Sequence, residues 1–267
     1  MNAQDFAAAT AALIEARRES HRVDPLPPAW SPQELAIAYR MQRAIARPLG
    51  DVRGWKVAAL TDAQQHAMAV PTPVAGPLLA PWVQHSAGQL SLSRFVEPRL
   101  ECEFAFELVR DLPERRAEAK PYTRAEVDAA VGNLLIGIEV SDSRLPAAGA
   151  STLWQLADNL NSGAYIVGPA SADWRGDIDF ASHAIALRAV VDGQRRELAH
   201  GTGRAILDGD PLAAVLLLAN AQPPGYGGLR AGQFVTTGSC TGAVAVPGPC
   251  AIEADFGVLG AVRLRFE

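Results

Sequence analysis

The chain has little of what marks secreted, membrane-spanning or disulfide-rich proteins. Its 267 residues include three Cys without paired spacing, which argues against a disulfide framework and for a reducing compartment. The N-terminus lacks the basic region and the unbroken apolar stretch of a signal peptide. No window holds about 18 uninterrupted apolar residues, so we expect no membrane span. These absences together predict a cytoplasmic protein.

Cationic runs and the common cofactor motifs are missing as well. The net charge is −5 and no cluster of Lys or Arg stands out, which argues against a nucleic-acid partner. Gly201-Thr202-Gly203 opens like a dinucleotide fingerprint, but Ile206 stands where the third Gly belongs. The five His show no spacing typical of metal ligands. We therefore look for chemistry elsewhere in the chain.

What is present is an ordinary globular composition, 49% hydrophobic and 20% charged. Residues 3–20 are rich in Ala, Leu, Glu and Arg and predict a helix. Ser31 as N-cap, Pro32 at the first helical position and Glu34 in a capping box predict the start of a second helix. We expect these two helices to form an N-terminal helical lobe over residues 1–50.

From residue 51 onwards, short β-like runs alternate with Gly, Pro and Asp. Two further helices are predicted over 123–133 and 209–221, each with a capping residue at its start. Because strands dominate this part, we expect an α+β fold, with a mixed β-sandwich or roll over 51–267 that forms one compact unit. The predicted strands are 53–59, 96–108, 134–141, 164–168, 183–191, 233–237, 249–254 and 261–266.

The most informative stretch runs from Glu101 to Glu107. Successive side chains on a strand point to opposite faces. One face therefore carries apolar side chains fit for a core, among them Cys102, while the other places Glu101 and Glu103 side by side. Like charges held this close are unfavourable unless a positive group lies between them. A hard divalent cation, which prefers oxygen ligands, is the simplest candidate.

Other segments place unusual polar residues inside apolar surroundings. Lys56 stands in an apolar strand, where an ammonium must be paired or functional because burying it alone is costly. Glu139 is likewise an isolated carboxylate in an apolar strand. Two turn-like segments, 157–163 and 236–242, are rich in Asp, Asn, Ser, Thr and Gly. Surface positions for Lys56 and Glu139, and simple turn roles for the hydroxyl residues, are the alternatives that these patterns leave open.

Taken together in chain order, these segments resemble the 2-keto-4-pentenoate hydratase / 4-oxalocrotonate decarboxylase family of the fumarylacetoacetate hydrolase superfamily. The resemblance covers nearly the whole chain. It rests on the Pro98–Phe106 strand, on Glu139-Val140-Ser141-Asp142-Ser143-Arg144 and on Ala157-Asp158-Asn159. It implies a β-sandwich or roll of the fumarylacetoacetate hydrolase C-terminal-domain type, in which 51–267 is the catalytic domain, and a homo-oligomer.

The resemblance also implies roles for individual residues. Glu101, Glu103 and Glu139 would bind Mg²⁺ or Mn²⁺, and Lys56 would lie beside the substrate as a catalytic residue. The substrate's carboxylate would be flanked by hydroxyls of two turns, from Ser162, Thr237 and Ser239. Asp142 and Arg144 would form a supporting ion pair, with Asp158 behind the site.

Two positions depart from the family pattern. Hydratases of this family carry an acidic residue in a turn after the lysine strand, where this chain has Val74, and related decarboxylases are aliphatic there. We interpret Val74, Ala75 and Leu78 as signs of a roomier, less polar pocket. The family also tends to have a Glu near residue 201, where His200 stands as a substitute acid–base group.

The resemblance implies a divalent-metal-dependent lyase that acts on a short unsaturated 2-oxo acid from the breakdown of aromatic compounds. Three carboxylates, one Lys and an M²⁺ ion sum to zero charge, and a 2-oxo acid can fill two of six metal positions. The metal would stabilise a dienolate, which supports hydration or decarboxylation. A C–C bond hydrolase of acylpyruvates and a degenerate binding paralogue without turnover are the alternatives.

Overall fold

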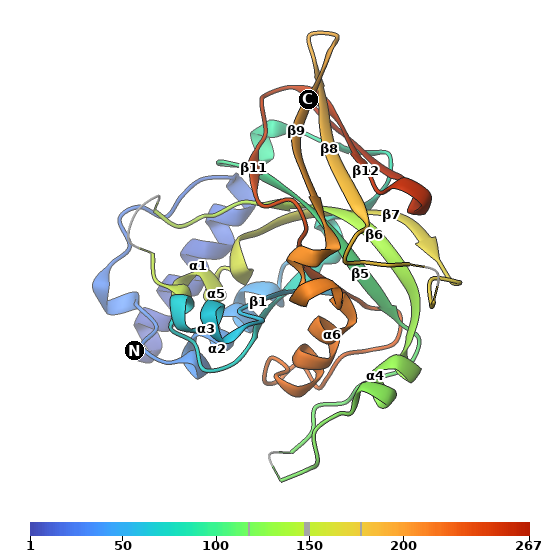
Figure 1. Ribbon diagram of the computed structural model, residues 1–267. Helices are drawn as coiled ribbons and strands as arrows, with labels where there is room; N and C mark the ends of the chain where they lie inside the picture. The colour runs from blue at the N-terminus through green and yellow to red at the C-terminus, as the bar shows by residue number, and fades with distance from the viewer. Residues whose placement is uncertain (117, 147–149, 177) are drawn as a thin grey trace.

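The computed structural model describes residues 1–116, 118–146, 150–176 and 178–267 (Figure 1). The first two helices are α1 (Ala3–Glu19) and α2 (Leu35–Ala46), which pack together through Leu13, Met41 and Ile45. The first predicted helix is confirmed, but the predicted start of the second is wrong. Ser31 instead closes a 3₁₀ turn, since its N–H donates to the Pro28 carbonyl, and α2 begins only after Glu34.

The remaining chain forms two β-sheets. The large sheet has the order β2-β1-β10-β5-β6-β7-β3, with β11 also paired to β5, and the small sheet has the order β4-β13-β12-β8-β9. The large-sheet strands are β1 (Val52–Ala58), β2 (Val74–Leu79), β3 (Val83–His85), β5 (Arg99–Leu108), β6 (Val131–Ser141), β7 (Ser162–Ser171), β10 (Phe234–Ser239) and β11 (Val244–Ala245). The small-sheet strands are β4 (Gly88–Leu90), β8 (Ala184–Val191), β9 (Gln194–Thr202), β12 (Cys250–Asp255) and β13 (Ala261–Phe266).

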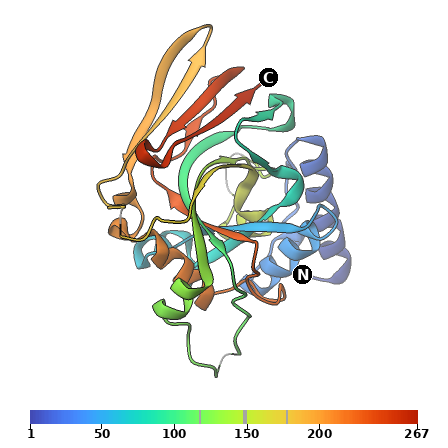
Figure 2. The ribbon, with the colours of Figure 1, turned by 90° about the vertical axis from the view of Figure 1, so that its right-hand side faces the viewer.

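The large sheet curls until its ends meet. Strands β2 and β7, which lie near opposite ends of the strand order, contact one another. Figure 2 shows the strands of this sheet encircling a central space, with α1 and α2 on one side and the small sheet on another. Strands of this sheet share one cluster of buried apolar side chains: Leu78, Ala105, Leu135, Tyr165, Val167 and Phe234.

The main core lies between the two sheets. The apolar face of β5 packs there, with Leu100, Cys102, Phe104, Phe106 and Leu108 all fully buried or nearly so. The small sheet contributes Leu187, Ile252, Val262 and Leu264. The predicted α+β sandwich, and the predicted apolar face of the Glu101–Glu107 strand, are therefore confirmed.

Four short α-helices follow α2 in the described residues. They are α3 (Asp62–Met68), α4 (Arg124–Ala130), α5 (Thr152–Ala157) and α6 (Pro211–Asn220). Helix α4 ends earlier than predicted because Val131 already takes extended backbone angles and starts β6. None of the helices in the described ranges combines the length and apolarity that a bilayer crossing requires.

The expected turn at residues 74–76 is a further point at which the structure differs from the sequence analysis. These residues do not form a turn, because they begin β2, which pairs with β1 from Val74 opposite Ala58 onwards. Val74 is fully buried among Ala59, Val70, Leu156 and Leu160. The division at residue 50 stays a prediction, since α2 packs on α5 as well as on α1.

Candidate functional site

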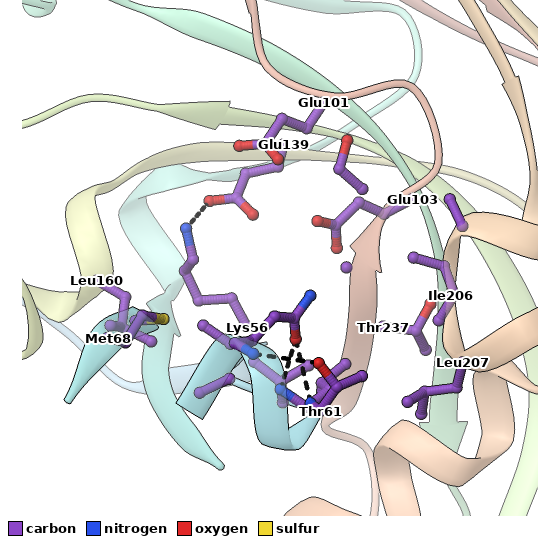
Figure 3. Close-up of a pocket in the computed structure, with 18 of the residues that line it drawn as sticks. Lys56, Thr61, Met68, Glu101, Glu103, Glu139, Leu160, Ile206, Leu207 and Thr237 are labelled. Atoms are coloured by element: carbon purple, nitrogen blue, oxygen red, sulfur yellow. Dashed lines mark hydrogen bonds and ion pairs between the residues drawn. The ribbon is translucent and has the colours of Figure 1, made fainter. Parts of the chain in front are cut away.

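Three carboxylates converge on the inner face of the curled sheet. Glu101 and Glu103 alternate along β5, and strand register places Glu101 directly opposite Glu139 of β6. The exposed fractions of Glu103 and Glu139 are 3% and 2%, while Glu101 is half-buried. Figure 3 shows all three side chains facing one space. The alternation predicted from the sequence thus places the two β5 carboxylates as expected.

Lys56 reaches the same space from β1. Its ammonium donates to Oε1 of Glu139 and forms an ion pair with it (Figure 3). In the strand order β1 and β6 are three steps apart, which in a flat sheet would be about 14 Å at the usual spacing of neighbouring strands. The pair can form only because the sheet curls.

The electrostatics of this group are dominated by burial and by mutual repulsion. Burial, with Glu139 and Glu101 nearby, raises the pKa of Glu103 well above its usual range, and Thr236 and Lys56 oppose this only in part. Burial also raises the pKa of Glu139, against the effect of Lys56. For Lys56, burial lowers the pKa but is outweighed by the three carboxylates, so its pKa is raised and it stays protonated. One ammonium is thus set against three carboxylates.

The chemistry of this group fits a divalent cation. All candidate donors are carboxylate oxygens, which hard cations prefer. Oε2 of Glu103 is buried and has no hydrogen-bond partner among the described residues. Three carboxylates and one ammonium leave a charge of −2, which one M²⁺ ion cancels. Among the described residues, no three Asp, Glu, His or Cys side chains have their ligand atoms gathered closely enough to hold a metal ion as they stand. The Glu139 carboxylate is paired with Lys56 instead.

The carboxylates form the base of a cavity of about 390 Å³. Its walls include Thr237 and Ser239 from β10, both expected from the sequence. The hydroxyl of Thr237 donates to the Phe104 carbonyl at 3.0 Å, whereas Oγ of Ser239 has no partner among the described residues. Leu60, Met68, Leu160, Ile206 and Leu207 give the cavity an apolar part, beside the polar side chains of Thr61, Gln64 and Gln155. Figure 3 shows Met68 and Leu160 on one side of the cavity and Ile206 and Leu207 on the other.

Sequence reasoning missed helix α3, which supplies one wall of the cavity. Its start carries a capping box, in which the Thr61 hydroxyl accepts from the Gln64 N–H and the Gln64 side chain accepts from the Thr61 N–H. The same Thr-x-x-Glu/Gln signal identified α4 from the sequence. Met68, near the end of α3, was therefore within reach of the same reasoning.

His200 does not reach this cavity. It lies on β9 of the small sheet, and its side chain is 82% exposed beside Glu197, at 3.3 Å. Strand β9 projects away from the large sheet together with β8 (Figure 1). The expectation of an acid–base role for His200 is therefore corrected. Nor do Val74, Ala75 and Leu78 line the cavity, since all three are buried behind its walls.

Ser162 is placed behind the site and does not line the cavity. Its carbonyl accepts from Arg17 Nη1 at 2.6 Å and from Arg144 Nη2 at 2.9 Å. Both guanidiniums also bind the fully buried Asp158, and Arg144 pairs with Asp142, as expected. This network holds the turn that precedes Ser162. The three residues of that turn, 159–161, all have positive φ. Arg17 itself had no sequence signal, because it reads as one of several Arg on a helix.

Comparisons with known proteins agree with this architecture. No family model matches the chain. It is 31% identical to the 2-keto-4-pentenoate hydratase of Paraburkholderia phymatum, over 96% of this chain and 95% of the relative. It is 30% identical to the 2-keto-4-pentenoate hydratase of Burkholderia vietnamiensis, over 98% of this chain and 97% of the relative. For the 4-oxalocrotonate decarboxylase of Pseudomonas putida the identity is 28%, over 100% and 98%.

Solved structures share the fold. The structure of 4-oxalocrotonate decarboxylase from Pseudomonas putida G7, complexed with magnesium and adipate, has a TM-score of 0.86 at 24% identity and covers 100% of this chain and 99% of that one. A fumarylpyruvate hydrolase from Pseudomonas aeruginosa, in complex with Mn²⁺ and pyruvate, has a TM-score of 0.50 at 18% identity, over 80% and 88% of the two chains. Because the curated hydratases match over nearly their full length, the chain belongs to the 2-keto-4-pentenoate hydratase / 4-oxalocrotonate decarboxylase family and is an enzyme of the lyase type.

Proposed function

We propose that the protein is a divalent-metal-dependent lyase acting on a short unsaturated 2-oxo acid. The observation that carries this is the meeting of three carboxylates and one Lys at the base of a cavity with an apolar part. The magnesium and Mn²⁺ complexes of the structural neighbours support a divalent cation, so Mg²⁺ or Mn²⁺ is the proposed cofactor. The substrate's 2-oxo acid end would lie at the base and its tail in the apolar part.

Glu101, Glu103 and Glu139 would hold the cation. Bound there, it would supply Lewis-acid stabilisation of negative charge on the 2-oxo group. Lys56 is protonated and lies at the same base, so it can donate a proton to the substrate or hold its developing negative charge. Ser239 lines the cavity, and its buried hydroxyl has no partner among the described residues, so it is the best placed of the three hydroxyl residues to bind the substrate carboxylate.

The apolar part of the cavity favours hydration over decarboxylation. Among the described residues that line the cavity, Lys56 is the one cationic side chain, and it lies beside the carboxylates. Arg22 and Arg99 line an adjoining cavity that shares Lys56 and Glu101, on the other side from Met68, Ile206 and Leu207. A distal carboxylate, which a decarboxylase must remove as CO₂, would meet the apolar side chains Met68, Ile206 and Leu207. Burial of a carboxylate without a cation is costly. We therefore propose a hydrocarbon tail, with water adding its hydroxyl to C4 and a proton going to C3 of a 2-oxo-3-enoate.

Two matched substrates test this directly. One is a 2-oxo-enoate with a methyl or vinyl tail, and the other carries a carboxylate at the same position. After chelation and reloading with Mg²⁺ or Mn²⁺, we expect hydration of the first with at least a tenfold higher kcat/KM. No turnover of either compound with either metal would refute the proposed lyase. Preferred release of CO₂ from the dicarboxylate would refute the assignment of the tail.

The two Lys of the chain provide a matched pair of variants. Lys56→Met should lower kcat by about 10²-fold or more, since a positioned acid or base contributes that much. Lys120→Met, at an exposed position away from the cavity, should leave kcat unchanged. Release of pyruvate from an acylpyruvate would instead indicate a C–C hydrolase, and metal binding without any turnover a degenerate paralogue.

The wider setting follows from the same family membership. We propose that the enzyme acts in the breakdown of aromatic compounds, in the cytoplasm and as a homo-oligomer. The names of the relatives, 2-keto-4-pentenoate hydratase and 4-oxalocrotonate decarboxylase, support a short unsaturated 2-oxo acid as the substrate in such a setting. Size-exclusion chromatography with light scattering tests the last point, and a monomeric mass would overturn it.

A further inference from the structure

Besides the Ser239 hydroxyl, three buried polar atoms near the carboxylates have no hydrogen-bond partner in the described part of the chain. They are Oε2 of Glu103, the hydroxyl of Tyr165 and the hydroxyl of Thr236. The exposed fractions of residues Glu103, Tyr165 and Thr236 are 3%, 0% and 0%. A buried polar atom without a partner costs about 1 to 3 kcal/mol, so three in one region require an explanation.

Strand register places all three atoms on the same inner face of the large sheet. Tyr165 of β7 lies opposite Glu139, while Gly137 of β6 lies opposite Glu103. A Cβ built on Gly137 would stand 2.1 Å from the Tyr165 hydroxyl oxygen. Directly paired residues of neighbouring strands have Cβ atoms about 5 Å apart. The hydroxyl therefore occupies the space that Gly137 leaves open beside Glu103.

Thr236 approaches Glu103 from the other side. It lies on β10 opposite Ala105, the next residue of β5 on the inner face. Its hydroxyl opposes the rise in the pKa of Glu103, which burial causes. Tyr165 and Thr236 thus flank one carboxylate from β7 and β10, the strands on either side of the β5–β6 pair.

The ring of Tyr165 is firmly held. It packs against Phe234, with ring centroids 5.2 Å apart, inside the apolar cluster of the large sheet. A phenol carries its proton at neutral pH, so the hydroxyl is available as a donor.

We infer that Tyr165 and Thr236 are positioning residues that donate hydrogen bonds to Glu103, directly or through one bridging water, and so aim its other oxygen at the metal. This inference rests on the proposed function, because it requires a metal at the carboxylates. Partners behind a metal ligand fix its orientation, and their loss costs about 10- to 100-fold in metal affinity. Gly137 is required for the same arrangement, because any side chain at that position would displace the Tyr165 hydroxyl.

The experiment measures metal affinity rather than turnover. Chelator-treated protein is titrated with Mn²⁺, by calorimetry and by the loss of the free-ion paramagnetic resonance signal. Tyr165→Phe and Thr236→Val should each raise the Kd by about 10- to 100-fold. Thr236→Ser, which keeps the hydroxyl, should restore wild-type affinity. Tyr122→Phe is the matched control, because that hydroxyl donates to the Pro113 carbonyl at 2.8 Å, outside the cavity.

The outcomes separate this inference from the proposed function. If wild-type protein binds no Mn²⁺, the proposed function fails. If wild-type protein binds Mn²⁺ and both Tyr165→Phe and Thr236→Val bind it within twofold of wild type, the inference fails while the proposed function stands. Thermal melting in chelator shows that each variant is folded. Should Tyr165→Phe not fold, the pair Thr236→Val and Thr236→Ser decides the question alone.

Discussion

Arg17 ties the first helix to the turn behind the site, and its replacement by Met tests whether this tie is structural. Its side chain is 3% exposed and donates to Oδ1 of Asp158 at 2.9 Å and to the Ser162 carbonyl at 2.6 Å. Burial, with Arg144 nearby, lowers its pKa to about 10, so Arg17 remains charged at neutral pH. Met fills much of the same volume without the charge.

The expected loss can be worked out from what remains. Breaking a buried ion pair costs about 3 to 5 kcal/mol when the partner is left uncompensated. In Arg17→Met, Asp158 keeps Arg144 as a partner, so we expect a loss near the lower limit, about 3 kcal/mol. Asp158→Ala leaves Arg17 and Arg144 facing each other with Asp142 alone, and should cost about 5 kcal/mol.

Urea unfolding followed by Trp fluorescence measures these losses, at one fixed protein concentration because association shifts apparent stability. The control is Arg124→Met, which breaks an ion pair with Asp210 whose side chains are both 47% exposed and should cost less than about 1 kcal/mol. The reasoning fails if Arg17→Met costs no more than the control, or if it costs more than Asp158→Ala.

Three further outcomes follow from the site. His200→Ala should leave kcat/KM for the preferred 2-oxo-enoate within twofold of wild type, because His200 lies outside the cavity; a larger loss would return it to the site. Val74→Asp should lower the free energy of unfolding by roughly 3 to 5 kcal/mol in urea, without raising hydration, because it buries an uncompensated charge. In chelator, the melting temperature should fall from about pH 5 to pH 8, and it should fall less in Glu103→Gln. The folded-state pKa of Glu103 is raised above its ordinary 4.5. The protonated carboxyl therefore contributes stability below pH 4.5, and this stability is lost as the pH rises through the raised pKa. Equal slopes in the two proteins would contradict this.

The features that could be predicted from the sequence are local ones. The faces of β5 follow from the period of two along a single strand, and α6 follows from its cap and its Ala/Leu-rich body. Strand β9 is polar and exposed along much of its length, so it lacks that alternation. The Asp192-Gly193 pair was the local signal for β9, because Asp-Gly is typical of a tight hairpin turn. In the structure both residues have positive φ and join β8 to β9.

The residues that the sequence misplaced depend on non-local packing. Nothing in the sequence around His200 shows that β9 lies in the small sheet, away from the carboxylates. Tyr165 reads as one more apolar residue of β7, and its hydroxyl acquires a role only because Gly137 lies on the neighbouring strand. Arg17 likewise gains its partners from residues about 140 positions away along the chain. Such pairings follow from register and topology rather than from local pattern.

Closure of the large sheet is the step on which the whole site depends. Lys56 meets Glu139 because β2 and β7 approach each other, which shortens a path of three strands. The packing of β2 on the turn before β7 requires Gly76, since a Cβ there would stand 2.6 Å from the Asn159 carbonyl oxygen of that turn. In the sequence, Gly76 follows two Pro and is typical of a loop. Gly76 therefore makes β2 look like a loop in the sequence. In the structure, the same residue leaves room for the close packing that accompanies closure of the sheet.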